Sequence, residues 1–438
     1  MIRLSTFLSA TGSRGNGAIF CMLVMLSMFC ASLSYAAPDE RIQTLAHEQK
    51  EPLLSTLKDL VAIESGSGDR EGLNKISALI HERLAALGGK VEFIEPGADA
   101  YRMQDTPKNI GRMVMARFEG TGTRKILLIA HMDTVYLRGM GAAQPFRIDG
   151  NRAYGLGISD DKGGVAVILH TLAMLKAMNF KDYRLITVLI NGDEEISSPG
   201  SRTMLTRLGG EHDAVMSFEG TGLANDQLSL ATAGIAGVSM KVKGKSSHAG
   251  SSPERGRNAL YEMAHQLLQT KDLSDPAIGV KMNWTVAHAG NNRNVIPADA
   301  DAMADVRVLR VSDYDGIEAK IRERIKNKLI DETTVEIIFE RRRPPLEATA
   351  ASRALAKHAQ TIYAEIGKTL RVAEIAEGGG TDAAFASLKT AAPVVERFGL
   401  QGFGAHSNDT EYVVIDSIEP RLYLATRLIV DIAQGKGR

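Results

Sequence analysis

The segment KILLIAHMDTVY, residues 125–136, decides the fold class of this chain. Its first half is a short run of branched apolar residues, which is typical of a strand buried on both faces. A similar run, LITVLINGDEE at 185–195, follows a segment with helical periodicity at 163–178, and 43–87 predicts two further helices. Strand, helix and strand in this order predict an α/β fold with a mainly parallel central sheet covered on both faces.

The middle of the chain has a different pattern. Alternating residues predict strands, and three-and-four spacing predicts helices, in the order strand 237–243, helix 258–270, strands 284–289 and 302–310, helix 314–329 and strand 334–340. This order is typical of a ferredoxin-like α+β module with one exposed sheet face. The first pattern then returns and ends in a helix at 419–432. We therefore expect a catalytic domain in two parts, 37–232 and 345–438, interrupted by a module at 233–344.

Length and charge limit the possible classes of function. A chain of 438 residues exceeds what one hydrophobic core usually serves, which favours two domains. Lys plus Arg and Asp plus Glu both number 52, so charge gives no support for a nucleic-acid partner. Aromatic residues make up only 5%, which also argues against a platform for stacked bases.

The N-terminus resembles a secretory signal peptide. A basic start precedes an apolar run at 18–33, and small residues follow up to a predicted cleavage site after Ala36. An uncleaved membrane anchor is the alternative, although the run is short for a span of about 20 residues. Both cysteines, Cys21 and Cys30, lie in this segment, so the mature chain would have no disulfide. We expect a periplasmic or secreted protein without a membrane partner after cleavage.

Polar residues gather where the predicted strands end, as catalytic residues do in open α/β sheets. His131 follows the first strand directly, and Asp133 can accept one ring N–H and leave the other imidazole nitrogen free for a metal. Asp160 and Asp161 stand in the glycine-rich segment 155–164. Adjacent acids would repel a phosphate, so a cation between the two carboxylates explains them better than a phosphate-binding loop.

A second pair of acids, Glu194 and Glu195, closes the second strand. Such neighbours repel each other unless a cation holds them, and one of the pair can be a ligand while the other is a general base. Glu219 and His406 also follow strand-like or glycine-rich segments. Two histidines and three carboxylates suit zinc, with manganese or cobalt as substitutes. With one bridging carboxylate, such a set can hold two ions about 3.5–4 Å apart.

Taken together, these motifs resemble the dinuclear zinc peptidase family that includes glutamate carboxypeptidase, aminoacylase and succinyl-diaminopimelate desuccinylase. The likeness is greatest to its bacterial glutamate carboxypeptidases. It covers nearly all of the mature chain, through motifs at 130–136, 157–170, 217–219, 244–250, 294–297, 378–384 and 399–412.

The resemblance implies two Zn²⁺ per subunit and a role for each candidate residue. His131 and Glu219 would bind one ion, Glu195 and His406 the other, and Asp160, joined to Asp161 by a cis peptide, would bridge both. Glu194 would be the general base, and Asp133 would orient His131.

The inserted module would be the family's lid and dimerisation domain. His248 would stabilise the oxyanion in the partner subunit of a homodimer, although a histidine in a polar loop can also be purely structural. Asn294 and Arg307 would line the carboxylate end of the substrate, Arg343 matches a basic position linked to acidic substrates, and the loop with Gly379 would approach the substrate through its backbone. The three side chains among these residues could equally be surface groups. Gln227 departs from the glutamate-specific pattern, in which close relatives carry a lysine.

The resemblance implies release of a C-terminal amino acid, above all glutamate, from folate-like, N-acyl or short peptide substrates. The same chemistry would serve an N-acyl amino-acid deacylase or a dipeptidase. A non-catalytic metal-bound binding protein is a third alternative. The presence of Glu194 and of all five ligand positions speaks against it.

Overall fold

The computed structural model describes residues 37–223, 226–407 and 409–437. The predicted signal peptide and both cysteines lie outside these residues, so cleavage after Ala36 stays a prediction. Within the described part of the chain, no helix is long and apolar enough to cross a membrane.

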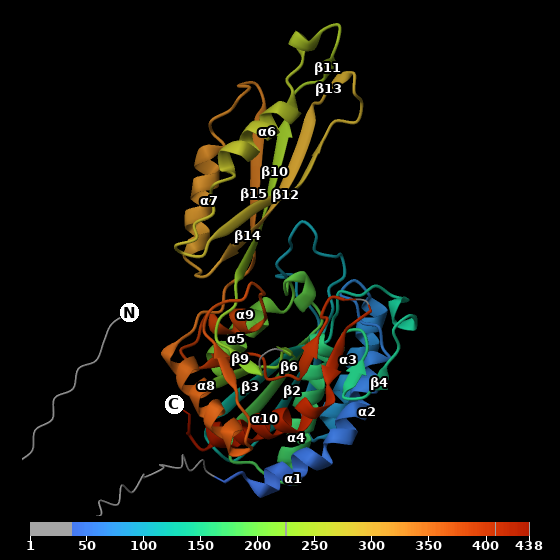
Figure 1. The fold of residues 1–438 in the computed structure, drawn as a ribbon, viewed down its shortest axis with the longest axis vertical. Helices are drawn as coiled ribbons and strands as arrows, with labels where there is room; N and C mark the ends of the chain where they lie inside the picture. Colours follow the sequence, from blue (N-terminus) through green and yellow to red (C-terminus); the bar gives the residue numbers. More distant parts are fainter. Residues whose placement is uncertain (1–36, 224–225, 408, 438) are drawn as a thin grey trace, which may run out of the picture. The chain divides into compact units, whose positions relative to one another are not determined.

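A mixed six-stranded sheet lies at the centre of the α/β part (Figure 1). The two strands predicted from the apolar runs, β3 (Lys125–His131) and β6 (Leu185–Asn191), are parallel neighbours. The remaining strands in this sheet are β1 (Lys90–Ile94), β2 (Met113–Glu119), β7 (Ala214–Ser217) and β17 (Val394–Val395). β7 and β17 continue the parallel arrangement, whereas β2 is antiparallel to both of its neighbours, β1 and β6, and makes the sheet mixed.

Both faces of this sheet are buried, as the apolar runs predict. In β3, Ile126 and Leu128 belong to one hydrophobic cluster, and Leu127 and Ile129 belong to another. The helices of the first cluster are α1 (Glu40–Glu48), α2 (Lys50–Val61), α3 (Arg70–Ala86), α4 (Gly163–Ala177), α8 (Ala350–Glu365) and α10 (Ile418–Ala433). The second cluster includes α5 (Arg202–Glu211) and α9 (Ala383–Ser387).

The N-terminal segment forms three helices where the sequence predicts two. α1 and α2 are separated by Gln49 alone, and α3 follows after a turn. Pro52 stands in the first turn of α2 and has no N–H to donate to Glu48, so one continuous helix would lose a hydrogen bond there.

Shorter strands bring the C-terminal loops beside the segment that contains Asp160. One sheet has the order β4 (Arg147–Asp149), β5 (Arg152–Tyr154), β19 (Tyr412–Val414), β18 (Gln401–Phe403) and β8 (Thr221–Gly222). A parallel pair joins β9 (Gln227–Ser229) to β16 (Arg371–Ala373).

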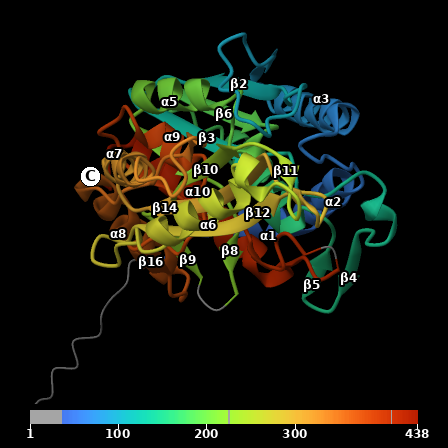
Figure 2. The ribbon, with the colours of Figure 1, turned by 90° about the horizontal axis from the view of Figure 1, so that it is seen from above.

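The inserted module is an antiparallel sheet with its own core. Its strands are β12 (Lys281–Ala289), β14 (Asp299–Val308), β10 (Gly234–Lys243) and β15 (Thr334–Arg343), in that order. α6 (Ala259–Thr270) and α7 (Asp313–Arg324) pack on one face, and α6 contacts β12 and β14 (Figure 2). A further pair, β11 (Ser247–His248) and β13 (Val295–Ile296), contains His248. The predicted βαββαβ order is confirmed, while the domain boundaries stay predictions.

Candidate metal centre

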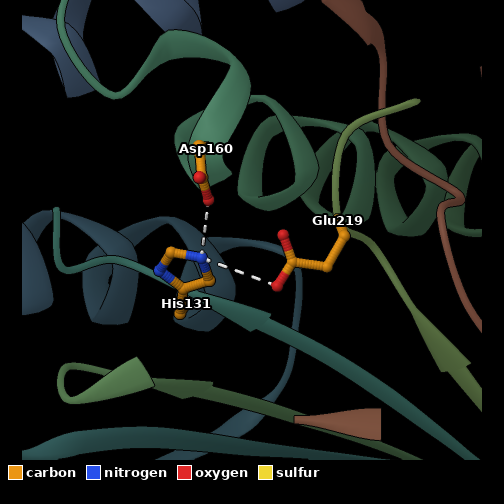
Figure 3. Close-up of side chains that lie close together, drawn as sticks. All are labelled: His131, Asp160 and Glu219. Carbon is orange, nitrogen blue, oxygen red and sulfur yellow. Dashed lines mark hydrogen bonds and ion pairs between the residues drawn. The ribbon is translucent and has the colours of Figure 1, made fainter. Parts of the chain in front are cut away.

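Three distant segments bring His131, Asp160 and Glu219 together (Figure 3). His131 ends β3, Asp160 lies in the turn η2 (Ile158–Lys162), and Glu219 follows β7. His131 Nε2 lies 3.0 Å from Asp160 Oδ1 and 3.6 Å from Glu219 Oε1. One imidazole and two carboxylates at this spacing offer a cation the mixed ligands that zinc accepts.

A second group shares Asp160 with the first. His406 Nε2 lies 3.3 Å from Asp160 Oδ2 and 3.2 Å from Glu195 Oε2. Asp160 therefore presents one carboxylate oxygen to each group, and its peptide bond to Asp161 is cis. The five side chains that the sequence selects as ligands form two adjoining groups, with Asp160 between them.

Carboxylates outnumber the two imidazoles in this cluster, and the pKa values reflect that excess. Burial alone would lower the pKa of His131, but its carboxylate neighbours, Glu219 foremost, raise it well above its usual value. Hydrogen bonds to Asp160 and Glu195 raise the pKa of His406 to about 10. Burial raises the pKa of Glu195 to about 7. The cluster favours positive charge at its centre, and a divalent cation would displace protons when it binds.

Asp133 connects His131 to the two acids that follow β6. His131 Nδ1 lies 3.0 Å from the Asp133 carbonyl oxygen and 3.4 Å from its Oδ1 atom. The same carboxylate accepts hydrogen bonds from the backbone N–H groups of Glu194 (3.0 Å) and Glu195 (3.1 Å) and from the Ser67 hydroxyl (2.7 Å). Asp133 is fully buried, so it can fix the imidazole and the Glu194–Glu195 turn at once.

Asp161 does not take the place that the sequence pattern indicates. Its Oδ2 accepts the His131 backbone N–H at 3.3 Å, and its Oδ1 accepts the Gly164 N–H at 3.2 Å in the first turn of α4. Asp161 belongs to neither ligand group. The expected cation between Asp160 and Asp161 is therefore corrected: Asp161 caps the helix, and Asp160 alone joins the cluster.

Sequence reasoning missed Glu411, which holds the turn around Asp160. Its Oε1 accepts the Ser159 N–H and its Oε2 the Gly157 N–H, both at 2.8 Å, and the Tyr136 hydroxyl donates to it at 2.6 Å. Glu411 is fully buried. The only available signal was its position in the motif 399–412.

Glu194 lies beside the two groups but belongs to neither. It is 7% exposed, and Arg343 Nη1 lies 2.9 Å from its Oε1. Arg343 Nη1 also lies 3.1 Å from Asp382, a second buried acid that sequence reasoning missed. Arg343, expected at the substrate, is itself only 3% exposed.

The other residues expected at the substrate lie in two places. His248 and Asn294 are exposed in the inserted module, and His248 Nδ1 accepts backbone N–H groups of its own loop at 3.1 Å. Among the described residues, neither side chain has a hydrogen bond or ion pair with the ligand groups. Arg307 donates to the Gly378 carbonyl at 3.1 Å, and the Gly379 carbonyl accepts the Ala233 N–H at 2.9 Å, so these two meet at the joint of the module.

Comparison with known proteins agrees with this arrangement. The model of peptidase family M20/M25/M40 matches residues 127–431. Carboxypeptidase G2 of Pseudomonas sp. (strain RS-16) is 42% identical over 414 residues, which cover 94% of this chain and 97% of that protein. An acetylornithine deacetylase of Photorhabdus laumondii is 25% identical over 65% of this chain and 75% of its own length.

Solved structures share the fold at low sequence identity. Aminopeptidase PepT from Bacillus cereus superposes with a TM-score of 0.71 at 20% identity and covers 88% of this chain and 99% of its own. The M20 family metallo-carboxypeptidase Sso-CP2 from Sulfolobus solfataricus gives 0.68 at 17%, over 86% and 98%. The family match spans all five residues of the two ligand groups, and the similarity to carboxypeptidase G2 extends over nearly the whole chain. The chain therefore belongs to peptidase family M20/M25/M40, as a metallopeptidase similar to carboxypeptidase G2.

Proposed function

We propose that this enzyme releases a C-terminal amino acid, glutamate foremost, from folate-like, N-acyl or short peptide substrates, with two zinc ions and with Glu194 as the general base. The observation that carries this proposal is the position of Glu194. It stands next to the ligand residue Glu195 and outside both ligand groups, and Arg343 Nη1 lies 2.9 Å from its Oε1.

The donor atoms fit two zinc ions. His131 and Glu219 would hold one ion, His406 and Glu195 the other, and the two oxygens of Asp160 would be shared. This equal division, one imidazole and one carboxylate on each side of a bridging carboxylate, supports a pair of similar ions. When bound, the ions lower the pKa of a water and polarise the carbonyl of the scissile amide.

The protein's own groups would manage the proton. With Arg343 beside Oε1, Glu194 would use its carboxylate to accept a proton from the attacking water and to deliver it to the leaving nitrogen. Burial raises the pKa of Glu194 well above its usual value, although the Arg343 charge opposes that rise. A raised pKa suits a group that must take up and release a proton near neutral pH.

The surroundings of the cluster leave room for an extended substrate. A groove of about 640 Å³ reaches Glu195 and is lined partly by the apolar side chains of Val135 and Leu137, which are 40% and 74% exposed. Such a groove can take the acyl side of an amide. Gln227 is buried, and its amide donates to Glu377 at 3.3 Å, so no lysine charge is available there. A glutamine in place of lysine at position 227 favours the broader alternative, an N-acyl amino-acid deacylase or dipeptidase.

Dimerisation and export complete the proposal. His248 lies on an exposed loop, where a second subunit could receive its imidazole at the carbonyl oxygen of the bound substrate. The signal peptide predicted at 1–36 supports a periplasmic or secreted homodimer.

The test uses the chain from residue 37 onward, loaded with zinc. We expect it to hydrolyse folate and N-acyl glutamate, and to lose this activity with a chelator. Glu194→Gln should abolish turnover while zinc content stays at two ions, whereas the matched change Glu195→Gln should lower zinc content as well. Full turnover by Glu194→Gln would refute the base. Cleavage of neutral N-acyl amino acids alone would favour the deacylase.

A further inference from the structure

Three consecutive arginines end β15, the last strand of the inserted module, and their side chains go to different places. Arg341 pairs with Asp315 of α7 at 2.6 Å, inside the module. Arg342 pairs with Asp105 at 2.6 Å, on the surface. Arg343 alone is buried and reaches the Glu194 turn.

The terminal nitrogens of Arg343 are occupied by protein acceptors. Nη1 lies 2.9 Å from Glu194 Oε1 and 3.1 Å from Asp382 Oδ1, and Nη2 donates to the Glu194 carbonyl oxygen at 2.6 Å. A side chain at Gly380 would place its Cβ atom 2.7 Å from Arg343 Cδ, so the arginine stem is packed tightly as well. A guanidinium held in this way orients Glu194, and three of its five N–H groups are directed at protein acceptors.

A second arginine, Arg202, connects the turn after Glu194 to the end of β15 by hydrogen bonds. Arg202 of α5 donates Nη2 to the carbonyl oxygens of Ser197 (2.5 Å) and Arg342 (2.7 Å), and Nε to that of Ser198 (3.2 Å). Its guanidinium stacks 4.1 Å from the centre of the Tyr101 ring. Arg202 therefore ties the backbone after Glu194 to the backbone before Arg343.

A residue of the inserted module also holds the joint where the chain enters and leaves the module. The Tyr314 hydroxyl of α7 donates to the carbonyl oxygens of Ile235 (3.2 Å) and Arg343, the residues where the chain enters and leaves the module. The module, its joint and the Glu194 turn thus form one chain of hydrogen bonds.

We propose that Arg343 and Arg202 are positioning residues that couple the orientation of the inserted module to the position of Glu194. This inference rests on the proposed role of Glu194 as the base. It removes Arg343 from the residues that bind the substrate.

The first experiment measures kcat and KM of the zinc-loaded chain with N-acyl glutamate. Arg343→Lys keeps the charge but cannot serve Glu194 and Asp382 with a planar fork, so we expect kcat to fall about 10–100-fold with KM within about threefold. Arg202→Lys should lower kcat about 3–10-fold, again with little change in KM. Arg341→Lys is the matched control and should keep both constants within about twofold.

The second experiment needs no turnover. In chelator-treated protein, hydrogen exchange of the backbone amides at 194–198 should accelerate in Arg343→Lys and Arg202→Lys but not in Arg341→Lys. These amides include Ser197 N–H, which donates to the Glu194 carbonyl oxygen at 2.8 Å. If Arg343→Lys does not fold, Arg202→Lys decides the outcome by both measurements.

A substrate-binding role for Arg343 predicts the opposite split. Arg343→Lys would then raise KM at unchanged kcat and leave exchange at 194–198 unaltered, and either result overturns the proposal. Full activity of Glu194→Gln would instead refute the base itself, and faster exchange at 194–198 would still show that the two arginines hold this turn.

Discussion

Changing Asp133 to asparagine tests whether this residue orients a metal ligand. The carboxylate lies close to His131 Nδ1 and accepts the N–H groups of Glu194 and Glu195 and the Ser67 hydroxyl. Asparagine has nearly the same shape, but it replaces one acceptor oxygen with a donor and removes the charge. The substitution should therefore weaken metal binding without emptying any space in the core.

The size of the effect follows from the two orientations of the new amide. In the first orientation, the NH₂ group faces the Glu194 N–H and His131, so both contacts with the former carboxylate oxygen are lost. In the other it meets the Glu195 N–H and the Ser67 hydroxyl, and the hydroxyl can turn to accept. The second orientation leaves one buried N–H unpaired, which costs about 1–3 kcal/mol of stability. Loss of the carboxylate beside the imidazole should lower zinc affinity and kcat/KM about 10–100-fold.

Asp193→Asn provides the matched control. Asp193 is also fully buried and accepts two backbone N–H groups, from Gly200 (2.6 Å) and Ser201 (3.1 Å), but none of its hydrogen bonds involves His131. Urea unfolding should show similar losses of stability in both variants. Competition with a chromophoric chelator should show weaker zinc binding in Asp133→Asn only. Equal zinc affinities in the two variants would refute the orienting role.

Three further predictions concern the dimer, the metal and the substrate. Mixing equal amounts of inactive His248→Ala and inactive Glu194→Gln subunits should restore about a quarter of wild-type activity. Half of the dimers then contain one subunit of each kind, and in each such dimer one of the two active sites has both Glu194 and His248. No recovery would mean that His248 does not act across subunits. Zinc affinity should rise at least about tenfold per pH unit from about 7 to 9, because the His406 pKa is about 10 without metal and binding displaces this proton. Since that pKa lies above the usual 6.5, His406 stabilises chelator-treated protein below about pH 6.5, and this stabilisation is lost as the pH rises through 10. If neither the zinc affinity nor the stability of the metal-free protein changed with pH, His406 would not be a metal ligand. Gln227→Lys alone should raise the preference for C-terminal glutamate over leucine less than about threefold, because Glu377 neutralises the new charge. The double change Gln227→Lys with Glu377→Gln should raise this preference further, and equal preferences in the single and the double variant would contradict this reasoning.

The sequence predicted those parts of the fold in which burial leaves a strong periodic signal. The runs that form β3 and β6 are apolar on both faces, and the module alternates over whole strands. The three-residue strands β5 and β19 have no such signal, since they pair residues 152–154 with 412–414 across most of the chain. Pro52 was overlooked because proline is tolerated in the first turn of a helix.

The ligand groups could be foreseen because strand ends and glycine-rich loops place unusual residues at one edge of a sheet. The buried carboxylates that position the ligand groups could not be predicted from the sequence. Glu411 and Asp382 are buried and hydrogen-bonded, but each looks in the sequence like an ordinary surface acid. For the same reason the run Arg341–Arg343 gave no hint that one arginine is buried and the other two are exposed or half-buried.

The buried group of Arg343, Glu194 and Asp382 restricts how the inserted module can move. Removing such charges from water is costly, and separating them while they stay buried costs still more, so this contact should persist during any reorientation. A rotation that leaves Glu194 in place must therefore bend β10 and β15 on the module side of Arg343. The register of this strand pair shifts between Ile235 and Ala236, next to the carbonyl that Tyr314 holds. Irregular pairing weakens a ladder locally, so bending there would turn the module without moving Glu194, whereas a rotation that carries the joint along would move Arg343 and Glu194 together.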